Sequence, residues 1–129
     1  MKISNKSKSA VAPDNSQPLD IPAEKFQAEV LESSQPVLVE FWTPWSRSCQ
    51  VFEPVLNEVT RVCAGKVKVV KINADDSLDL SVVYDIQSIP TLIYFIAGQP
   101  HVRIVGTASK EAILAKLKAC GLPEINNTK

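Results

Sequence analysis

The sequence predicts an α/β fold in which a central mixed β-sheet is flanked by helices on both faces. Two observations predict this fold class. An apolar run over residues 37–42 precedes a helical pattern over 47–62 and a β-rich run over 67–73, and this order implies a right-handed parallel crossover. A later β-rich run over 91–96 turns through four residues into 101–105, which adds an antiparallel hairpin to the sheet.

A first helix is expected over residues 22–33. Pro22 suits the first turn of a helix, because its missing N–H is not needed there. Phe26, Val30 and Leu31 recur on one face, which is the periodicity of an amphipathic helix.

The next strand and helix have a clear apolar pattern. Residues 37–42 are apolar apart from Glu40, as expected of a strand that is covered on both sides. The helix over 47–62 should be kinked at Pro54, which lacks a backbone donor, and Gly65 should end it. The apolar stripe of this helix consists of Val51, Phe52, Val55, Leu56 and Val59.

The second half of the chain adds a short helix over 78–84 and a final helix over 110–119. Ser109 is the expected N-cap of the final helix, and Gly121 is its expected stop. The residues of the final helix that should face inward are Ile113, Leu114 and Leu117.

Length and composition indicate one globular domain without unusual charge. The chain has 129 residues, of which 45% are hydrophobic and 22% charged, so it can bury a core without disulfides or metals. Fourteen basic and fourteen acidic side chains balance, and no basic stripe with aromatics is present, so no nucleic-acid partner is expected. The apolar runs are too short for a membrane span, so no membrane partner is expected either.

The domain itself is expected over residues 21–122. Residues 1–20 are rich in Lys, Ser, Pro and Asn and have no periodicity, which predicts a flexible N-terminal tail. Residues 123–129 should form a short C-terminal tail. No apolar signal core precedes the domain, so a secretory signal is not expected.

The three cysteines do not predict a disulfide framework. Cys49 and Cys63 are expected on one helix, about 21 Å apart, whereas a disulfide requires Cα atoms within about 7 Å. Nothing in the sequence places Cys120 beside either of them. Free thiols fit a reducing compartment, and a cytoplasmic location is therefore predicted.

The residues most specific for chemistry are Trp45-Ser46-Arg47-Ser48-Cys49, at the predicted start of the second helix. After a buried strand and a turn, a Cys-x-x-Cys dithiol that cycles against disulfides is typical. Here the first position is Ser46, and a hydroxyl does not form a disulfide.

Further segments in the same order make the chain resemble the thioredoxin family. They are Val-Leu-Val-Glu-Phe-Trp-x-x-Trp (37–45), Pro54 five residues after Cys49, Lys-Ile-Asn-Ala-Asp (71–75), Tyr-Asp-Ile-x-Ser-Ile-Pro-Thr-Leu (84–92), Phe95, Gly98 and Val105-Gly106. The resemblance covers about residues 21–122, and it implies the thioredoxin fold.

The resemblance implies roles for Ser46 and Cys49. In the family the first cysteine is the exposed nucleophile and the second resolves the mixed disulfide; Ser46 occupies the first position and Cys49 the second. A serine hydroxyl is far less acidic than a thiol, so helix capping is its expected role. Two interpretations of Cys49 stay open: a shielded packing thiol, which the family pattern favours, or a residual thiol that holds a mixed disulfide or a metal in a dimer.

The resemblance also implies a role for Glu40. The family has an acid at this position, which helps to move a proton to or from the second cysteine. Burial of a carboxyl raises its pKa, and Lys71 on the neighbouring strand is the expected charge partner. A buried ion pair without a catalytic task is the alternative interpretation.

Ile89-Pro90 resembles the cis-proline loop of the family, which offers backbone groups to an extended substrate. The groove beside Pro90 should accept a peptide by strand-like pairing. The other residues expected to line this groove are Trp45, Arg47, Ile89, Thr91, Gly106 and Thr107.

The chain is therefore predicted to be a thioredoxin-like protein of the thiol–disulfide oxidoreductase family, which acts in cell redox homeostasis. Its Ser-x-x-Cys site should not complete a dithiol–disulfide cycle. The alternatives are a non-catalytic module that binds peptides or partners, and a monothiol role for Cys49. The expected partners are proteins bound at the cis-proline groove, and a thioredoxin reductase if a parent protein carries Cys at position 46. No metal and no cofactor are expected, and the chain should be a monomer.

Overall fold

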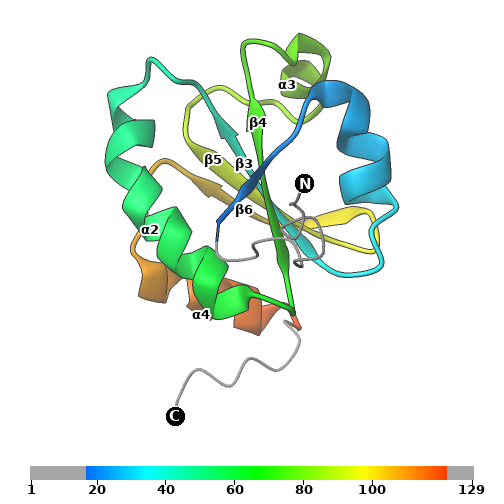
Figure 1. Ribbon diagram of the computed structural model, residues 1–129, viewed down its shortest axis with the longest axis vertical. Helices are drawn as coiled ribbons and strands as arrows, with labels where there is room; N and C mark the ends of the chain where they lie inside the picture. Colours follow the sequence, from blue (N-terminus) through cyan, green and yellow to red (C-terminus); the bar gives the residue numbers. More distant parts are fainter. Residues whose placement is uncertain (1–16, 122–129) are drawn as a thin grey trace, which may run out of the picture.

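The computed structural model describes residues 17–121 and contains a five-stranded sheet in the order β2-β4-β3-β5-β6 (Figure 1). β3 lies at its centre, parallel to β4 and antiparallel to β5. The predicted α/β class with a mixed sheet is therefore confirmed. The strands are β2 (Leu19–Asp20), β3 (Val37–Trp42), β4 (Lys68–Asn73), β5 (Thr91–Ile96) and β6 (Gln99–Val105).

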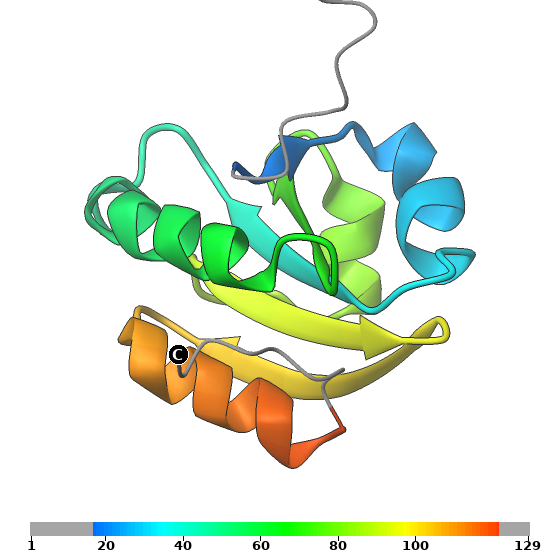
Figure 2. The same ribbon diagram turned by 60° about the horizontal axis from the view of Figure 1, so that its bottom comes forward.

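Helices cover both faces of the sheet (Figure 2). α2 and α4 pack on one face, and α3 and two short helices, η1 and η2, pack on the other. The helices are η1 (Ala23–Lys25), η2 (Gln27–Leu31), α2 (Arg47–Cys63), α3 (Leu78–Val83) and α4 (Lys110–Ala119). Within the described part of the chain, none of these helices has the length and apolar character needed to cross a membrane.

The first helix differs from its prediction. Residues 22–33 do not form one α-helix; a 3₁₀ turn, η1, leads into a π-helical turn, η2, which Glu32 N–H closes by donating to Gln27 O at 2.9 Å. Phe26 and Val30, on which the prediction rested, are both buried. Burial of two side chains four residues apart suits several short helical geometries, so the apolar pattern did not distinguish between them.

The N-terminal boundary of the domain also differs. Leu19 and Asp20, which were assigned to the tail, form β2 and pair in parallel with Val70 and Lys71 of β4. Ile21 N–H continues this contact by donating to Lys71 O at 3.0 Å. A two-residue strand held by backbone hydrogen bonds has no side-chain periodicity to detect. The rest of the predicted tails, 1–16 and 122–129, lies outside the described residues.

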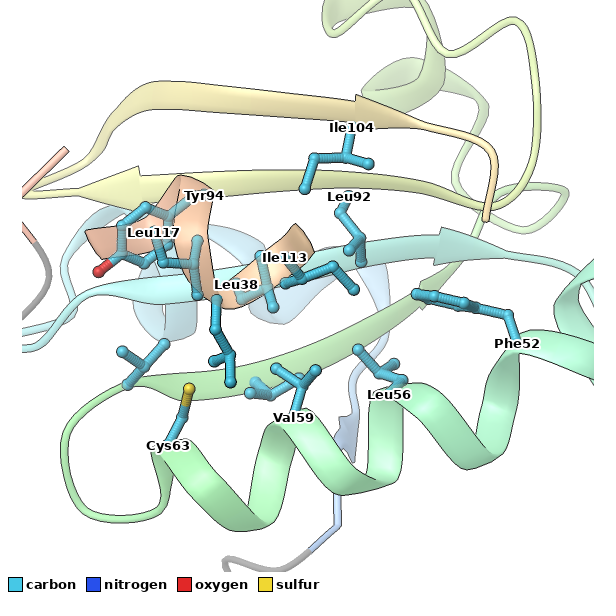
Figure 3. Close-up of a cluster of buried hydrophobic side chains, with 13 residues drawn as sticks. Leu38, Phe52, Leu56, Val59, Cys63, Leu92, Tyr94, Ile104, Ile113 and Leu117 are labelled. Atoms are coloured by element: carbon cyan, nitrogen blue, oxygen red, sulfur yellow. The ribbon is translucent and has the colours of Figure 1, made fainter. Parts of the chain in front are cut away.

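The core is divided by the sheet into two clusters. Side chains alternate along β3, so Leu38 faces α2 and α4 whereas Val39 faces η2 and α3. Figure 3 shows the first cluster, which we call the α2/α4 core. It contains Leu38, Phe52, Leu56, Val59, Cys63, Val67, Val69, Leu92, Tyr94, Ile104, Ile113, Leu114 and Leu117. The second cluster, the η2/α3 core, contains Ile21, Phe26, Val30, Val37, Val39, Phe41, Val70, Ile72, Ile93 and Phe95.

Candidate functional site

The predicted site residues gather where β3 ends and α2 begins. The sheet register pairs Phe41 with Thr91 and Thr91 with Val105, so the start of β5 lies between the ends of β3 and β6. The loop before β5 and the loop after β6 therefore meet at the edge of the sheet from which the chain enters α2.

Ser46 is the N-cap of α2. Its backbone is extended, and its Oγ accepts a hydrogen bond from Cys49 N–H at 3.2 Å. The Ser46 side chain is buried, with 6% of the residue exposed. The hydroxyl therefore satisfies one of the free N–H groups in the first turn of the helix, which is the capping role expected of it.

Cys49 lies one helical turn further along α2 and is buried as a free thiol. The neighbouring Arg47 is exposed to solvent. Cys63 and Cys120 are free as well, and burial raises the pKa of the Cys63 thiol to about 11. At neutral pH Cys63 is therefore a protonated packing residue of the α2/α4 core, whereas Cys49 lies in the first turn of α2 beside Ser46.

Glu40 is buried in the middle of β3, with 2% of the residue exposed. Burial raises the pKa of its carboxyl from 4.5 to about 7. The Lys71 ammonium opposes this rise, and the charges of Glu53 and Asp20 add to it. Glu40 is therefore poised to take up or release a proton near neutral pH.

Lys71 is beside Glu40 in the parallel register of β3 and β4, as predicted, but its ion pair is with another residue. Its Nζ lies 3.8 Å from Glu53 Oε2 and 4.0 Å from the centre of the Trp42 ring. Among the described residues, no Glu40–Lys71 ion pair falls within 4.0 Å, but the Lys71 charge still favours the ionised form of Glu40, so the expected charge partner acts without a direct ion pair. Lys71 pairs with Glu53 because the Glu53 side chain is 58% exposed and keeps its hydration while it holds the cation.

Sequence analysis missed Glu53, although a signal for it was present. Glu53 follows Cys49 by four residues, so on a helix it lies one turn away on the same face. A carboxylate at that spacing from the thiol is expected to face the same strands as the thiol.

A small cavity of about 30 Å³ joins these groups. Its volume and polar lining suit a single water molecule. Two of its lining residues, Trp42 and Thr43, each carry a buried polar atom, Nε1 and Oγ1, that has no hydrogen-bond partner among the described residues. The lining consists of Glu40, Trp42, Thr43, Pro44, Cys49, Gln50, Glu53 and Lys71. The buried acid and the thiol therefore share one polar cavity.

The loop before β5 is tied to the loop after β6. The Ile89–Pro90 peptide bond is cis, and Gly106 N–H donates to Pro90 O at 2.8 Å. Thr91, expected to line the groove, is 1% exposed, and its hydroxyl donates to Ser88 O at 2.6 Å. The buried Thr91 side chain therefore holds the loop before β5 and does not line an open groove.

Arg103 on β6 also holds this loop, and sequence analysis did not identify it. Its guanidinium donates to Tyr84 O and, at 3.4 Å, to Asp85 O. Asp85 has a positive φ of 54°, so the arginine holds the backbone at a residue in the left-handed conformation. No sequence spacing connects Arg103 to residues eighteen or nineteen positions earlier.

Trp45 is the most prominent exposed side chain of the site, with 67% of the residue exposed. Its Nε1–H donates to Asp75 Oδ2 at 2.7 Å, which fixes the ring beside the turn after β4. Asp75 is a third residue that sequence analysis did not assign to the site, after Glu53 and Arg103. The remaining predicted groove residues stay accessible: Ile89 and Gly106 are partly exposed and Thr107 is exposed.

The donor atoms near this site do not form a metal site. Among residues 17–121, no three His, Cys, Asp or Glu side chains lie close enough together to hold a metal ion.

A family model described as Thioredoxin matches residues 17–119, which is most of the chain. The chain belongs to the thioredoxin family. It is 42% identical over 93 residues to Thioredoxin 1 of Nostoc sp., a match that covers 72% of this chain and 87% of the relative. It is 41% identical over 92 residues to Thioredoxin C-2 of Corynebacterium nephridii, covering 71% and 85%. It is 42% identical over 89 residues to the chloroplastic M-type thioredoxin of Chlamydomonas reinhardtii, covering 69% and 64%.

The thioredoxin family is a family of thiol–disulfide oxidoreductases with a redox role, and the chain belongs to it. The family match includes the whole edge described above, from Glu40 to Gly106. Relatives include bacterial proteins and a chloroplastic one, so the comparisons do not single out a compartment.

Proposed function

We propose that this chain is a thioredoxin-family protein that binds extended peptide segments of partner proteins and does not complete a dithiol–disulfide cycle. The observation that carries this proposal is the hydrogen bond from Cys49 N–H to Ser46 Oγ, with Ser46 as the buried cap of α2. An oxygen atom occupies the position that the family resemblance assigns to the nucleophilic sulfur.

Disulfide reduction requires two sulfur atoms in succession. A thiolate attacks a sulfur of the substrate disulfide, a mixed disulfide forms, and the second thiol displaces the reduced substrate. In this chain Ser46 supplies a hydroxyl, which stays protonated at neutral pH and is engaged in capping the helix. The first step therefore has no nucleophile, and the cycle stops before it starts.

The surface around Pro90 supports the peptide-binding half of the proposal. Trp45 and Val105 are large apolar residues that stay exposed, at 67% and 58%. Exposed apolar side chains beside a fixed loop suit a bound segment in extended conformation. Ile89, Gly106 and Thr107 add accessible backbone on the same edge.

Insulin reduction by dithiothreitol tests the proposal. The chain as it stands should show no turnover above the uncatalysed background, because Ser46 does not form a mixed disulfide. Ser46→Cys should restore turnover, since Glu40, Cys49 and Pro90 are already in place. Ser46→Ala is the matched control, and it should stay at background.

Two results would contradict the proposal. Turnover by the unmodified chain would show that Ser46 does not block the cycle. An inert but folded Ser46→Cys protein would show that the rest of the site is not that of a disulfide reductase. Only the peptide-binding half of the proposal would then remain.

A monothiol role for Cys49 has less support, because only 6% of the residue is exposed. Labelling of the native protein with iodoacetamide near neutral pH should therefore be slow. We also propose that the protein works in a reducing, cytoplasm-like compartment as a monomer, consistent with its three free cysteines. A thioredoxin reductase becomes an expected partner only if the parent of this chain carries Cys at position 46.

A further inference from the structure

Two carboxylates and one cation share the cavity beneath the start of α2. Glu40 projects from β3, Glu53 from α2 and Lys71 from β4, and all three line the same cavity of about 30 Å³. Only one ammonium group is therefore present for two carboxylates, and its position decides which of them it pairs with.

The geometry gives the cation to Glu53. Lys71 Nζ is 3.8 Å from Glu53 Oε2, although Glu40 is the direct register partner of Lys71 in the sheet. A cation–π interaction with the Trp42 ring, whose centre is 4.0 Å from Nζ, also stabilises the ammonium in this position. The Lys71 side chain is itself only 14% exposed, so solvent screens its interactions with the two carboxylates only weakly.

The charges around Glu40 can be named element by element. Lys71 faces it from β4, Glu53 and the Cys49 thiol from α2, and Asp20 acts on it from β2. On the β5 side its register partner is Leu92, which carries no charge. Lys71 is therefore the cation that stabilises an ionised Glu40, and its ammonium group is paired with Glu53.

We propose that Glu53 is a positioning residue that draws the Lys71 ammonium toward itself and so weakens the stabilisation that this cation gives to the ionised form of Glu40. The more exposed carboxylate takes the cation because it keeps most of its hydration in the pair. Glu40 then remains beside Cys49 as a carboxylic acid through the lower part of the neutral range. This inference does not depend on peptide binding or disulfide turnover.

The side-chain carboxyl of Glu40 can be titrated directly by ¹³C NMR in the full chain. Glu53→Gln keeps the shape of the side chain and removes its charge. Lys71 is then free to approach Glu40, and a cation at that range favours the carboxylate. The midpoint of the Glu40 titration should fall by about one pH unit. Contacts between the Lys71 and Glu40 side-chain protons should strengthen in the same variant.

Glu58→Gln is the matched control. Glu58 lies on the same helix, is similarly exposed at 53%, and pairs with Lys110 at the same 3.8 Å distance. Its loss removes an equal charge from α2 without touching Lys71. The Glu40 midpoint should stay where it is in the unmodified chain.

A second background separates positioning from simple repulsion between Glu40 and Glu53. In Lys71→Met, the Glu53→Gln change should produce a clearly smaller shift, because no cation remains to be released. The proposal is overturned if the shift is the same in both backgrounds, or if Glu53→Gln and Glu58→Gln act alike in the unmodified chain. If Lys71→Met does not fold, unchanged Lys71–Glu40 proton contacts in Glu53→Gln would overturn the proposal equally.

Discussion

Glu40 links the stability of the fold to pH through its burial in β3. The pKa of its carboxyl is about 7 in the folded chain, against 4.5 as the ordinary value. Because the folded state binds this proton more tightly, the stabilising contribution is complete below about pH 4.5 and is lost as the pH rises through about 7. At about 1.4 kcal/mol for each pKa unit, the loss amounts to about 3 kcal/mol.

Glu40→Gln should remove this dependence. The free energy of unfolding of the variant, relative to that of the unmodified chain, should rise by about 3 kcal/mol between pH 4.5 and pH 8. Urea denaturation at a series of pH values measures it. Glu24→Gln, at an exposed carboxyl, is the control, and its relative stability should change little over the same range. A constant difference between Glu40→Gln and the unmodified chain would show that Glu40 ionises normally in the fold.

Ser46 is expected to stabilise α2 as its cap. Ser46→Ala leaves Cys49 N–H without its acceptor, so the free energy of unfolding should fall by about 1 kcal/mol. Ser48→Ala is the control, because Ser48 is exposed inside the first turn and makes no cap; its effect should stay within about 0.5 kcal/mol. Equal losses in the two variants would argue against the cap.

Single residues were predictable where a short spacing carries the information. The order of Glu40, Ser46 and Cys49 along a strand, a turn and a helix places them together whatever the rest of the chain does. Asp75 and Arg103 were missed because each joins the site by a hydrogen bond across thirty or eighteen residues, respectively. Such contacts depend on the packing of whole elements, which local pattern does not specify.

At the scale of elements, the turn between β5 and β6 makes a close contact that fixes its sequence. Gly98 has a φ of +79°, and a Cβ there would lie 2.8 Å from Leu31 O at the end of η2. Gly65 has a similar φ of +84° but open space around it. The two glycines therefore separate backbone strain from steric contact.

Alanine substitution at both glycines should show that difference. Gly65→Ala should cost about 1 kcal/mol for its left-handed backbone alone. Gly98→Ala should cost at least about 1 kcal/mol more, because the hairpin turn and η2 must move apart. Thermal or urea unfolding measures both, and similar losses would mean that η2 gives way without resistance.

Elements were predictable in proportion to the strength of their periodicity. α4 occupies Lys110–Ala119, the range that its cap and apolar spacing predicted, and α2 ends within one residue of its prediction. β2 and η2 were not predictable in the same way, because backbone pairing to β4 and packing of Phe26 against the sheet define them. Tertiary contacts decide such short elements.

At the scale of the whole molecule, one sheet supports two separate cores. Adjacent residues of β3, such as Leu38 and Val39, belong to opposite cores. A substitution that destabilises one core therefore also destabilises the strands that the two cores share. The mixed sheet was predictable from the order of strands and helices, since crossover handedness and hairpin pairing leave few alternatives. The detailed division of the core required the register.

This arrangement predicts that the two cores unfold as one cooperative unit. Leu117→Ala removes a fully buried side chain from the α2/α4 core and should cost about 2–5 kcal/mol. Native-state hydrogen exchange should show that loss equally in the amides of β3, β4 and β5, although half of their side chains face the other core. Val82→Ala, at a position 79% exposed on α3, should change the same amides by less than about 0.5 kcal/mol. If Leu117→Ala weakened protection in α4 alone, the helix would be an independent unit and the sheet would not couple the two cores.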